Sequence, residues 1–304
     1  MGDELPLLSR TSPMRLVVCA LLVTLGLSAC GTAPSVSATT VAVVAAENFY
    51  GDIVQQLGDG HVSVVSILSD PTVDPHEYES SVQNAIAVSR AQLVIENGDD
   101  YDTWMDRLVA ASPNPKRVML VAADVARTKL PDNPHFWYSL EDIQTIAQAI
   151  TASLEGIDPG HKADYDRSLV AFQESLAPIR GKMTEIGSKY AGTPVGLTET
   201  IFLYQSEPIG LKVLTPFEFQ KAIAEGNDPP ADTVLTTDDQ IANHQVKILI
   251  YNTQTVTPVT INLTQEATKF HIPIVPVTET MPPGKHYQGW MLDQLAALQQ
   301  ALGG

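Results

Sequence analysis

The segment that decides the fold is residues 139–190, which read SLEDIQTIAQAITASLEGIDPGHKADYDRSLVAFQESLAPIRGKMTEIGSKY. Ser139 precedes Asp142 at the spacing of a capping box, with Asp in place of the usual Glu. This pattern predicts a helix that begins after Ser139 and runs to about Leu154.

A second helix is expected directly after the first. Asp158 and Pro159 supply an N-cap and a first-turn proline, and the helix that they open could reach Tyr190. Pro178 should kink or break it, because proline lacks the amide hydrogen that a helix interior needs. About thirty helical residues would span roughly 45 Å, the length of a whole domain. We therefore expect residues 139–191 to form a helical linker between two lobes, although two ordinary surface helices are the alternative.

On both sides of this segment, short β-branched runs alternate with helical patterns, which is typical of βαβ units and parallel sheets. The expected strands are 41–45, 62–68, 93–96 and 117–121 before the linker, and 194–198, 211–215, 246–251 and 272–277 after it. The chain is therefore predicted to be an α/β protein with two (β/α)4-type lobes with parallel sheets, an N-terminal lobe at 40–138 and a C-terminal lobe at 192–304.

The N-terminal region has the pattern of an export signal. Residues 16–27 form an apolar run that is too short to span a bilayer and has the length of a signal-peptide core. A small-residue ending followed at once by Cys30 resembles a bacterial lipoprotein signal. We expect residues 1–29 to be a signal peptide, Cys30 to be lipidated, and residues 30–39 to be a tether. An ordinary secretory signal is the alternative, and Met14 could be the true start.

Charge and cysteine content exclude several classes of function. The formal net charge of −17 argues against nucleic-acid binding, which needs a basic face. The same charge would raise the concentration of cations near the surface, although solubility alone also explains it. Cys19 lies in the expected signal peptide, so Cys30 is the one cysteine left after cleavage. We therefore expect neither an internal disulfide nor a thiolate metal site.

Two short motifs place a histidine directly after a proline: Asp74-Pro75-His76 and Asn133-Pro134-His135. Proline fixes its own φ and pushes the preceding residue toward an extended conformation, so each imidazole is presented from a stiff loop. Neutral imidazole is the commonest metal ligand in proteins. A metal site is therefore the first hypothesis, and two loop histidines that happen to follow prolines are the alternative.

Four possible ligands follow the carboxyl ends of expected strands. His76 and His135 come after strands of the first half, and Glu199 and Glu279 come after strands of the second half. In open parallel sheets, ligands bind outside the carboxyl ends of the strands. Two side chains from each half predict a site in the cleft between the lobes.

The chain resembles the substrate-binding proteins of zinc/manganese ABC importers, the cluster A-I type, over essentially all of residues 40–303. The segments that carry the resemblance are Ala46–Ile53, Asp74–His76, Asn97-Gly98 with Trp104, Pro134–Trp137, Glu199–Tyr204, Gly210-Leu211, Val277–Glu279 and Tyr287. The resemblance implies two (β/α) lobes joined by a rigid helix, with one metal ion between them.

The resemblance also implies which residues hold the metal. The family's first two ligands correspond to His76 and His135, and the third corresponds to Glu199, because the Glu-x-x-Phe-x-Tyr spacing holds. The fourth, usually Asp, corresponds to Glu279, where the flanking residues match weakly. Asn133 replaces the usual Asp before the second Pro-His pair, and the His-rich loop of many zinc members is missing between the two histidines.

Two imidazoles and two carboxylates form a mixed nitrogen and oxygen set. Carboxylates suit Mn²⁺, while imidazoles suit Zn²⁺ and Fe²⁺ as well or better. The two carboxylates and the missing His-rich loop favour Mn²⁺ slightly over Zn²⁺, with Fe²⁺ possible. Two carboxylates would also cancel the charge of one divalent ion in a partly buried site.

These observations predict a monomeric, lipid-anchored receptor on the extracytoplasmic face of the cell membrane. It would bind one divalent metal ion as cargo and pass it to an ABC permease and its ATPase. The sequence contains no HExxH motif, no Gly-x-Ser-x-Gly motif and no Gly-rich phosphate loop, so we do not expect an enzyme. A metal-independent surface adhesin and a metal-dependent hydrolase are the alternatives.

Overall fold

The computed structural model describes residues 40–71, 73, 78 and 81–303. The expected signal peptide, the tether with Cys30, and the predicted ligand His76 lie outside the described residues. Among the residues that are described, no helix combines the length and the apolar character needed to cross a membrane.

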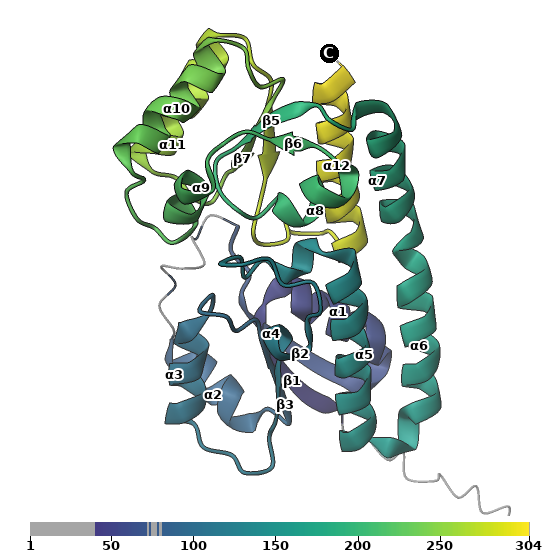
Figure 1. Ribbon diagram of the computed structural model, residues 1–304. Coiled ribbons are helices and arrows are strands. Elements are labelled where there is room, and N and C mark those ends of the chain that lie inside the picture. The colour runs from purple at the N-terminus through teal and green to yellow at the C-terminus, as the bar shows by residue number, and fades with distance from the viewer. Residues whose placement is uncertain (1–39, 72, 74–77, 79–80, 304) are drawn as a thin grey trace, which may run out of the picture. The chain divides into compact units, whose positions relative to one another are not determined.

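The first lobe is built on a four-stranded parallel sheet (Figure 1). Its strands are β1 (Val41–Glu47), β2 (Val62–Leu68), β3 (Leu93–Glu96) and β4 (Val118–Val121), in the order β2-β1-β3-β4. The helices of this lobe are α1 (Asn48–Gly58), α2 (Val82–Arg90), α3 (Thr103–Ala111) and α4 (Ala122–Val125), with 3-10 turns η1 (Asp59–His61) and η3 (Phe136–Tyr138). Strands β1 and β3 are buried along almost their whole length, as expected of central strands covered on both faces.

The second lobe repeats this architecture. Strands β5 (Pro194–Leu197), β6 (Lys212–Val213), β7 (Leu249–Asn252) and β8 (Ile274–Val277) form a parallel sheet in the order β6-β5-β7-β8. Its helices are α8 (Leu203–Ile209), α9 (Phe217–Ala224), α10 (Ala231–Ala242), α11 (Pro258–Lys269) and α12 (Tyr287–Gly303). All eight predicted strands are present. The two sheets have the same strand order, with β2 and β4 at the edges of the first sheet and β6 and β8 at the edges of the second.

The helical segment begins where its cap predicts. Helix α5 (Leu140–Ile157) starts after Ser139, whose side chain accepts a hydrogen bond of 3.2 Å from the backbone N–H of Asp142. The second helix follows as the 3-10 turn η4 (Pro159–His161) and the helices α6 (Lys162–Ser175) and α7 (Ala177–Tyr190). The predicted break occurs at Leu176, so that Pro178 falls in the first turn of α7, where it costs no hydrogen bond.

Helices α6 and α7 contact different lobes. Helix α6 packs against α1 and α5, whereas α7 packs against α8 and α12. Figure 1 shows α6 beside α5 and α7 beside α12. The core is continuous between the lobes, because the ring of Phe49 in α1 stacks on Trp137 with ring centroids 4.5 Å apart and lies 6.1 Å from Trp290 of α12. This shared core holds the carboxyl ends of both sheets next to each other.

Candidate metal centre

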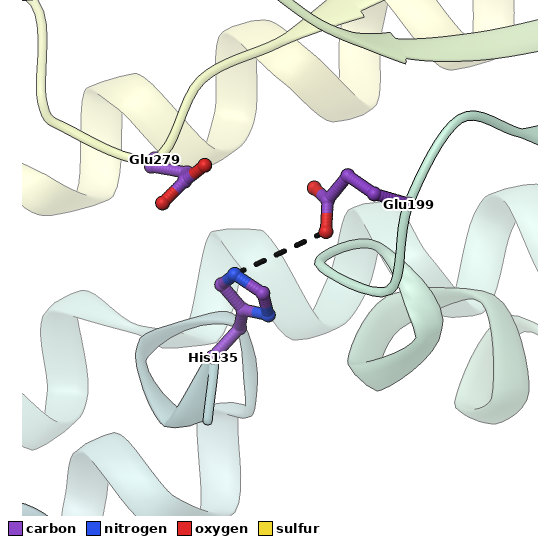
Figure 2. A group of neighbouring side chains, drawn as sticks. All are labelled: His135, Glu199 and Glu279. Atoms are coloured by element: carbon purple, nitrogen blue, oxygen red, sulfur yellow. Dashed lines mark ion pairs between the residues drawn. The ribbon is translucent and has the colours of Figure 1, made fainter. Parts of the chain in front are cut away.

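Three of the four predicted ligands meet in one buried cluster (Figure 2). His135, Glu199 and Glu279 each offer one ligand atom, and these atoms lie within 4.8 Å of one another. Nε2 of His135 is 4.0 Å from Oε2 of Glu199. All three side chains are almost completely shielded from solvent. The separations are those expected of groups that surround a single cation.

Strand ends bring the two carboxylates to this point. Glu199 stands two residues after the last residue of β5, and Glu279 stands two residues after the last residue of β8. His135 lies at the end of the loop after α4, immediately before the 3-10 turn η3. The two carboxylates therefore lie outside the carboxyl ends of their strands, the place where open parallel sheets bind ligands.

The ring of His135 is oriented by the residue two positions before it. Oδ1 of Asn133 lies 2.7 Å from Nδ1 of His135 and accepts a further hydrogen bond from its backbone N–H. Because an amide oxygen can only accept, Nδ1 carries the hydrogen and a neutral imidazole has its lone pair on Nε2. The side-chain amide of Asn133 donates to the carbonyl oxygen of Thr200, 2.9 Å away. Asn133 thus connects the histidine loop of the first lobe to the loop that carries Glu199.

Of the two carboxylate oxygens of Glu199, one accepts hydrogen bonds from described residues and the other accepts none. Oε2 accepts the backbone N–H of Ile201 at 2.8 Å and lies 3.5 Å from the hydroxyl group of Thr200. Oε1 accepts no hydrogen bond from any described residue, although the side chain is only 2% exposed. Burial raises the pKa of Glu199 well above its ordinary value, and the carboxylate of Glu279 adds to this shift. A bound cation would offset both effects.

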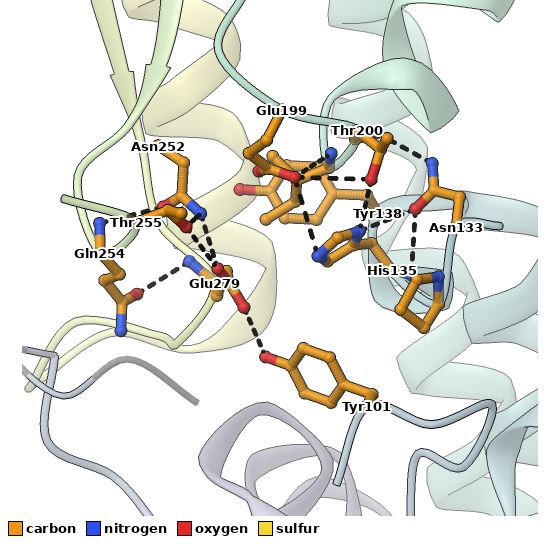
Figure 3. Close-up of polar contacts among 12 residues, drawn as sticks. Tyr101, Asn133, His135, Tyr138, Glu199, Thr200, Asn252, Gln254, Thr255 and Glu279 are labelled. Carbon is orange, nitrogen blue, oxygen red and sulfur yellow. Dashed lines mark hydrogen bonds and ion pairs between the residues drawn. The ribbon is translucent and has the colours of Figure 1, made fainter. Parts of the chain in front are cut away.

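Glu279 is surrounded by hydrogen-bond donors (Figure 3). Its Oε1 accepts from the side-chain amide of Asn252 at 2.6 Å and from the hydroxyl group of Thr255 at 3.2 Å. Its Oε2 accepts from the hydroxyl group of Tyr101 at 2.8 Å. Donors to both oxygens fix the position and the plane of the carboxyl group.

Gln254 holds the backbone around Glu279. Its side-chain oxygen accepts the backbone N–H groups of Glu279 and Thr280, at 2.8 and 2.9 Å, and the hydroxyl group of Thr280 at 3.1 Å. Its side-chain amide donates to the carbonyl oxygen of Val73 in the first lobe, 2.9 Å away. The loop that carries Glu279 is therefore tied to both lobes.

Sequence reasoning identified the three ligand candidates but missed the residues that orient them. These are Tyr101, Asn252, Gln254 and Thr255. Asn252 is the last residue of β7, and ligands bind outside the carboxyl ends of parallel strands, so its position in the sequence was sufficient to predict a place near the site. Tyr101 follows the Asn97-Gly98 pair closely but carries no local pattern that relates it to Glu279. The prediction for His76 stays a prediction, because this residue lies outside the described part of the chain.

A hollow of about 240 Å³ reaches His135 from the surface. It is lined by Asp99, Asp100, Asp132, Pro134, His135, Ala224 and Glu225. Its lining contains four carboxylates and comes from both lobes, so the field inside attracts cations.

The sequence model of one protein family, described as ZnuA, zinc-uptake complex component A periplasmic, matches residues 43–301. Curated relatives include the manganese ABC transporter substrate-binding lipoprotein PsaA of Streptococcus pneumoniae, 30% identical over 53% of this chain and 57% of the relative. The iron-binding protein YfeA of Yersinia pestis is 25% identical over 59% of this chain and 60% of the relative. The chain therefore spans less than two thirds of the length of these relatives.

Solved structures share the fold across almost their full length. The periplasmic zinc-binding protein TroA of Treponema pallidum superposes with a TM-score of 0.75 at 17% identity, covering 86% of this chain and 99% of that one. FpvC of Pseudomonas aeruginosa, solved with Mn²⁺, gives a TM-score of 0.73 at 18% identity, covering 87% and 99%. The predicted architecture of two α/β lobes with parallel sheets and a helical connection is confirmed.

Proposed function

Because this chain belongs to the ZnuA family of periplasmic zinc-uptake components, we propose that it is a substrate-binding protein that captures a divalent transition metal outside the cytoplasm. It would then deliver the ion to an ABC permease, and a partner ATPase would power transport through that permease. The observation that carries this proposal is the buried group of His135, Glu199 and Glu279, whose ligand atoms lie within 4.8 Å of one another.

The chemistry of this group suits a divalent cation. Two carboxylates in a buried site repel each other unless a positive charge lies between them. One divalent ion would cancel both charges, and the imidazole of His135 would add a neutral nitrogen ligand. We propose His76 as the fourth ligand on the strength of its Pro-His motif and the family resemblance.

The mixed nitrogen and oxygen set suits several transition metals. We propose Mn²⁺ as slightly favoured over Zn²⁺, with Fe²⁺ possible, because two carboxylates favour the harder ion. The names of the related proteins refer to manganese, iron and zinc, which supports a transition-metal cargo and leaves its identity to measurement.

The family consists of binding components of uptake systems and not of enzymes. We propose that the protein acts as a monomer at the extracytoplasmic face of the membrane, anchored by a lipid on Cys30. The description of relatives such as PsaA as lipoproteins supports the anchor.

Metal content would test this function directly. Protein that begins after Cys30 is stripped of metal and offered equal concentrations of Mn²⁺, Fe²⁺ and Zn²⁺, and the bound metal is measured by mass spectrometry. The wild type should retain one equivalent, and His135→Asn should retain none. His271→Asn is the matched control, because His271 is exposed and lies outside the cluster. Wild-type protein without stoichiometric metal would refute the proposal.

A further inference from the structure

Glu47 is a buried acid outside the metal cluster. It is the last residue of β1, is completely buried, and neither of its carboxylate oxygens accepts a hydrogen bond from a described residue. An ionised carboxylate in such a place would lose its hydration without compensation, at a cost of several kcal/mol. Its environment therefore has to supply either a cation or a proton.

The groups around Glu47 are themselves acidic. Asp102 is 4% exposed and Glu96 is 8% exposed. Burial, and then the neighbouring carboxylate of Asp102, raise the pKa of Glu47 well above its ordinary value, and Glu96 adds to this shift. The charge of Glu47 would also raise the pKa values of Tyr50 in α1 and Tyr101, whose phenol groups bring no positive charge.

Asp102, unlike Glu47, accepts hydrogen bonds from backbone amides. Its Oδ2 accepts the backbone N–H of Asn97 at 2.7 Å, and its Oδ1 accepts the backbone N–H of Gly98 at 2.8 Å. These bonds lower the pKa of Asp102, although burial raises it more. Glu47 has no comparable donors among the described residues. Of the two acids, Glu47 is therefore the one whose ionised form is less well solvated by the protein.

A metal ion fits this acidic group poorly. Among the described residues, His135, Glu199 and Glu279 bring three ligand atoms within 4.8 Å of one another. Glu47, Asp102 and Glu96 do not form such a group. A proton needs neither several ligands nor a cavity. A carboxylic acid can donate it to a carboxylate in a short, strong hydrogen bond.

We propose that Glu47 is a neutral carboxylic acid that shares its proton with Asp102, and that this pair positions residues 97–101 for the metal site. The inference rests on the proposed function of metal binding. Two hydrogen bonds connect this loop to the site. The side-chain amide of Asn97 donates to the carbonyl oxygen of Pro134, next to His135, at 2.9 Å, and Tyr101 donates to Glu279.

Glu47 therefore acts as a positioning residue and not as a ligand. Without its proton, two carboxylates would repel each other in a medium of low dielectric constant, and Asp102 would move away from the amides of Asn97 and Gly98. A glutamine at position 47 would still donate a hydrogen bond to Asp102. A leucine would fill a similar volume and donate none.

Infrared spectroscopy of the purified, metal-free protein tests the shared proton without any metal. The carbonyl stretch of a protonated carboxylic acid should persist at a pH one to two units above the pKa of Glu96, which burial raises to about 7. Glu199 also has a raised pKa in metal-free protein, so the comparison is made in a Glu199→Gln background, where the band should be lost when Glu47→Gln is added. A spectrum of the Glu199→Gln protein that lacks this band, or a band that survives the added Glu47→Gln, would overturn the proposal.

Hydrogen exchange and metal affinity test the positioning role. The amides of Asn97 and Gly98 should exchange faster in metal-free Glu47→Leu and at the wild-type rate in Glu47→Gln. Zn²⁺ affinity should fall about tenfold in Glu47→Leu and be restored in Glu47→Gln. Equal exchange in all three proteins would overturn the positioning role. A wild type that binds no metal would refute the proposed function instead, and the infrared and exchange results would still decide this inference.

Discussion

The hydroxyl group of Tyr101 donates a hydrogen bond of 2.8 Å to Oε2 of Glu279, and the two residues belong to different lobes. Tyr101 lies between β3 and α3 of the first lobe, and Glu279 follows β8 of the second. Both side chains are almost completely buried. This bond orients a proposed ligand and at the same time connects the lobes across the metal cluster (Figure 3).

Removing this hydroxyl group should weaken metal binding. Tyr101→Phe keeps the ring, which lies 4.8 Å from that of Trp137, and removes the hydroxyl group that donates to Glu279. We expect affinity to fall about tenfold, the lower end of the range for residues that orient metal ligands. Competition with a chelator of known affinity measures the change. Tyr165→Phe is the control, because its hydroxyl group donates to Asp158 and not to the cluster. Equal affinities in both variants would contradict the prediction.

Metal should stabilise the fold, because the cluster joins the two lobes. At a hundredfold excess over Kd, binding to the folded state alone contributes about 2.7 kcal/mol to the free energy of unfolding. Thermal unfolding with and without Mn²⁺ or Zn²⁺ measures this effect, and a chelator should reverse it. His135→Asn should show no such shift. An unchanged melting temperature of the wild type at saturating concentrations of both metals would count against a metal receptor.

Asp132, one of the residues that line the hollow that reaches His135, forms an ion pair with the second lobe. Nζ of Lys221 in α9 lies 2.9 Å from Oδ2 of Asp132 in the first lobe. Both side chains are partly exposed, so solvent and salt screen the attraction between them. We expect Lys221→Gln to release metal up to about fivefold faster, and high salt to reduce the difference between variant and wild type. Stopped-flow transfer of metal to a chelator measures the rate.

The matched control for this rate is Lys189→Gln. Lys189 pairs with Glu185 within α7, away from the hollow. The substitution leaves other contacts between the lobes intact, among them the two hydrogen bonds between Asn48 and Met281 and the bonds of Asp52 to His286 and Tyr287. Release at the wild-type rate in Lys221→Gln would show that metal leaves by another path.

Stability should depend on pH through Glu96. Burial, with Asp102 and two further carboxylates, raises its pKa to about 7. The folded state therefore holds this proton more tightly than the unfolded state, and Glu96 makes folding less favourable as pH rises from its unfolded pKa through 7. Glu96→Gln should raise the melting temperature of metal-free protein above pH 7 and lose this advantage at about pH 4.5.

Glu185 provides a control of opposite sign. Lys182, Gln299 and Lys189 bind its carboxylate and lower its pKa to about 2. Its contribution to stability is present above its unfolded pKa and is lost as pH falls toward 2. Glu185→Gln should therefore slightly lower the melting temperature above pH 7. The same sign for both variants would refute the assignment for Glu96.

Local patterns were sufficient to predict the elements of the fold. The cap at Ser139 and the break near Pro178 are confirmed because each depends on the hydrogen bonds of a few neighbouring residues. Strand bounds were less accurate. Strand β6 covers two residues of the five that were expected, because strand pairing and not β-branched composition decides where a strand ends.

For the site, the sequence by itself determined which side chains follow strand ends and prolines, and three of the four ligands predicted from it, His135, Glu199 and Glu279, lie together. Only the tertiary structure decided which polar groups surround them. Tyr101 and Glu279 are 178 residues apart, and the Gln254 amide binds a carbonyl oxygen 181 residues away. Such contacts have no local signature, because they form only when the two lobes pack together. The physical reason is that a hydrogen bond depends on the position of both partners, whereas a sequence pattern describes the surroundings of one.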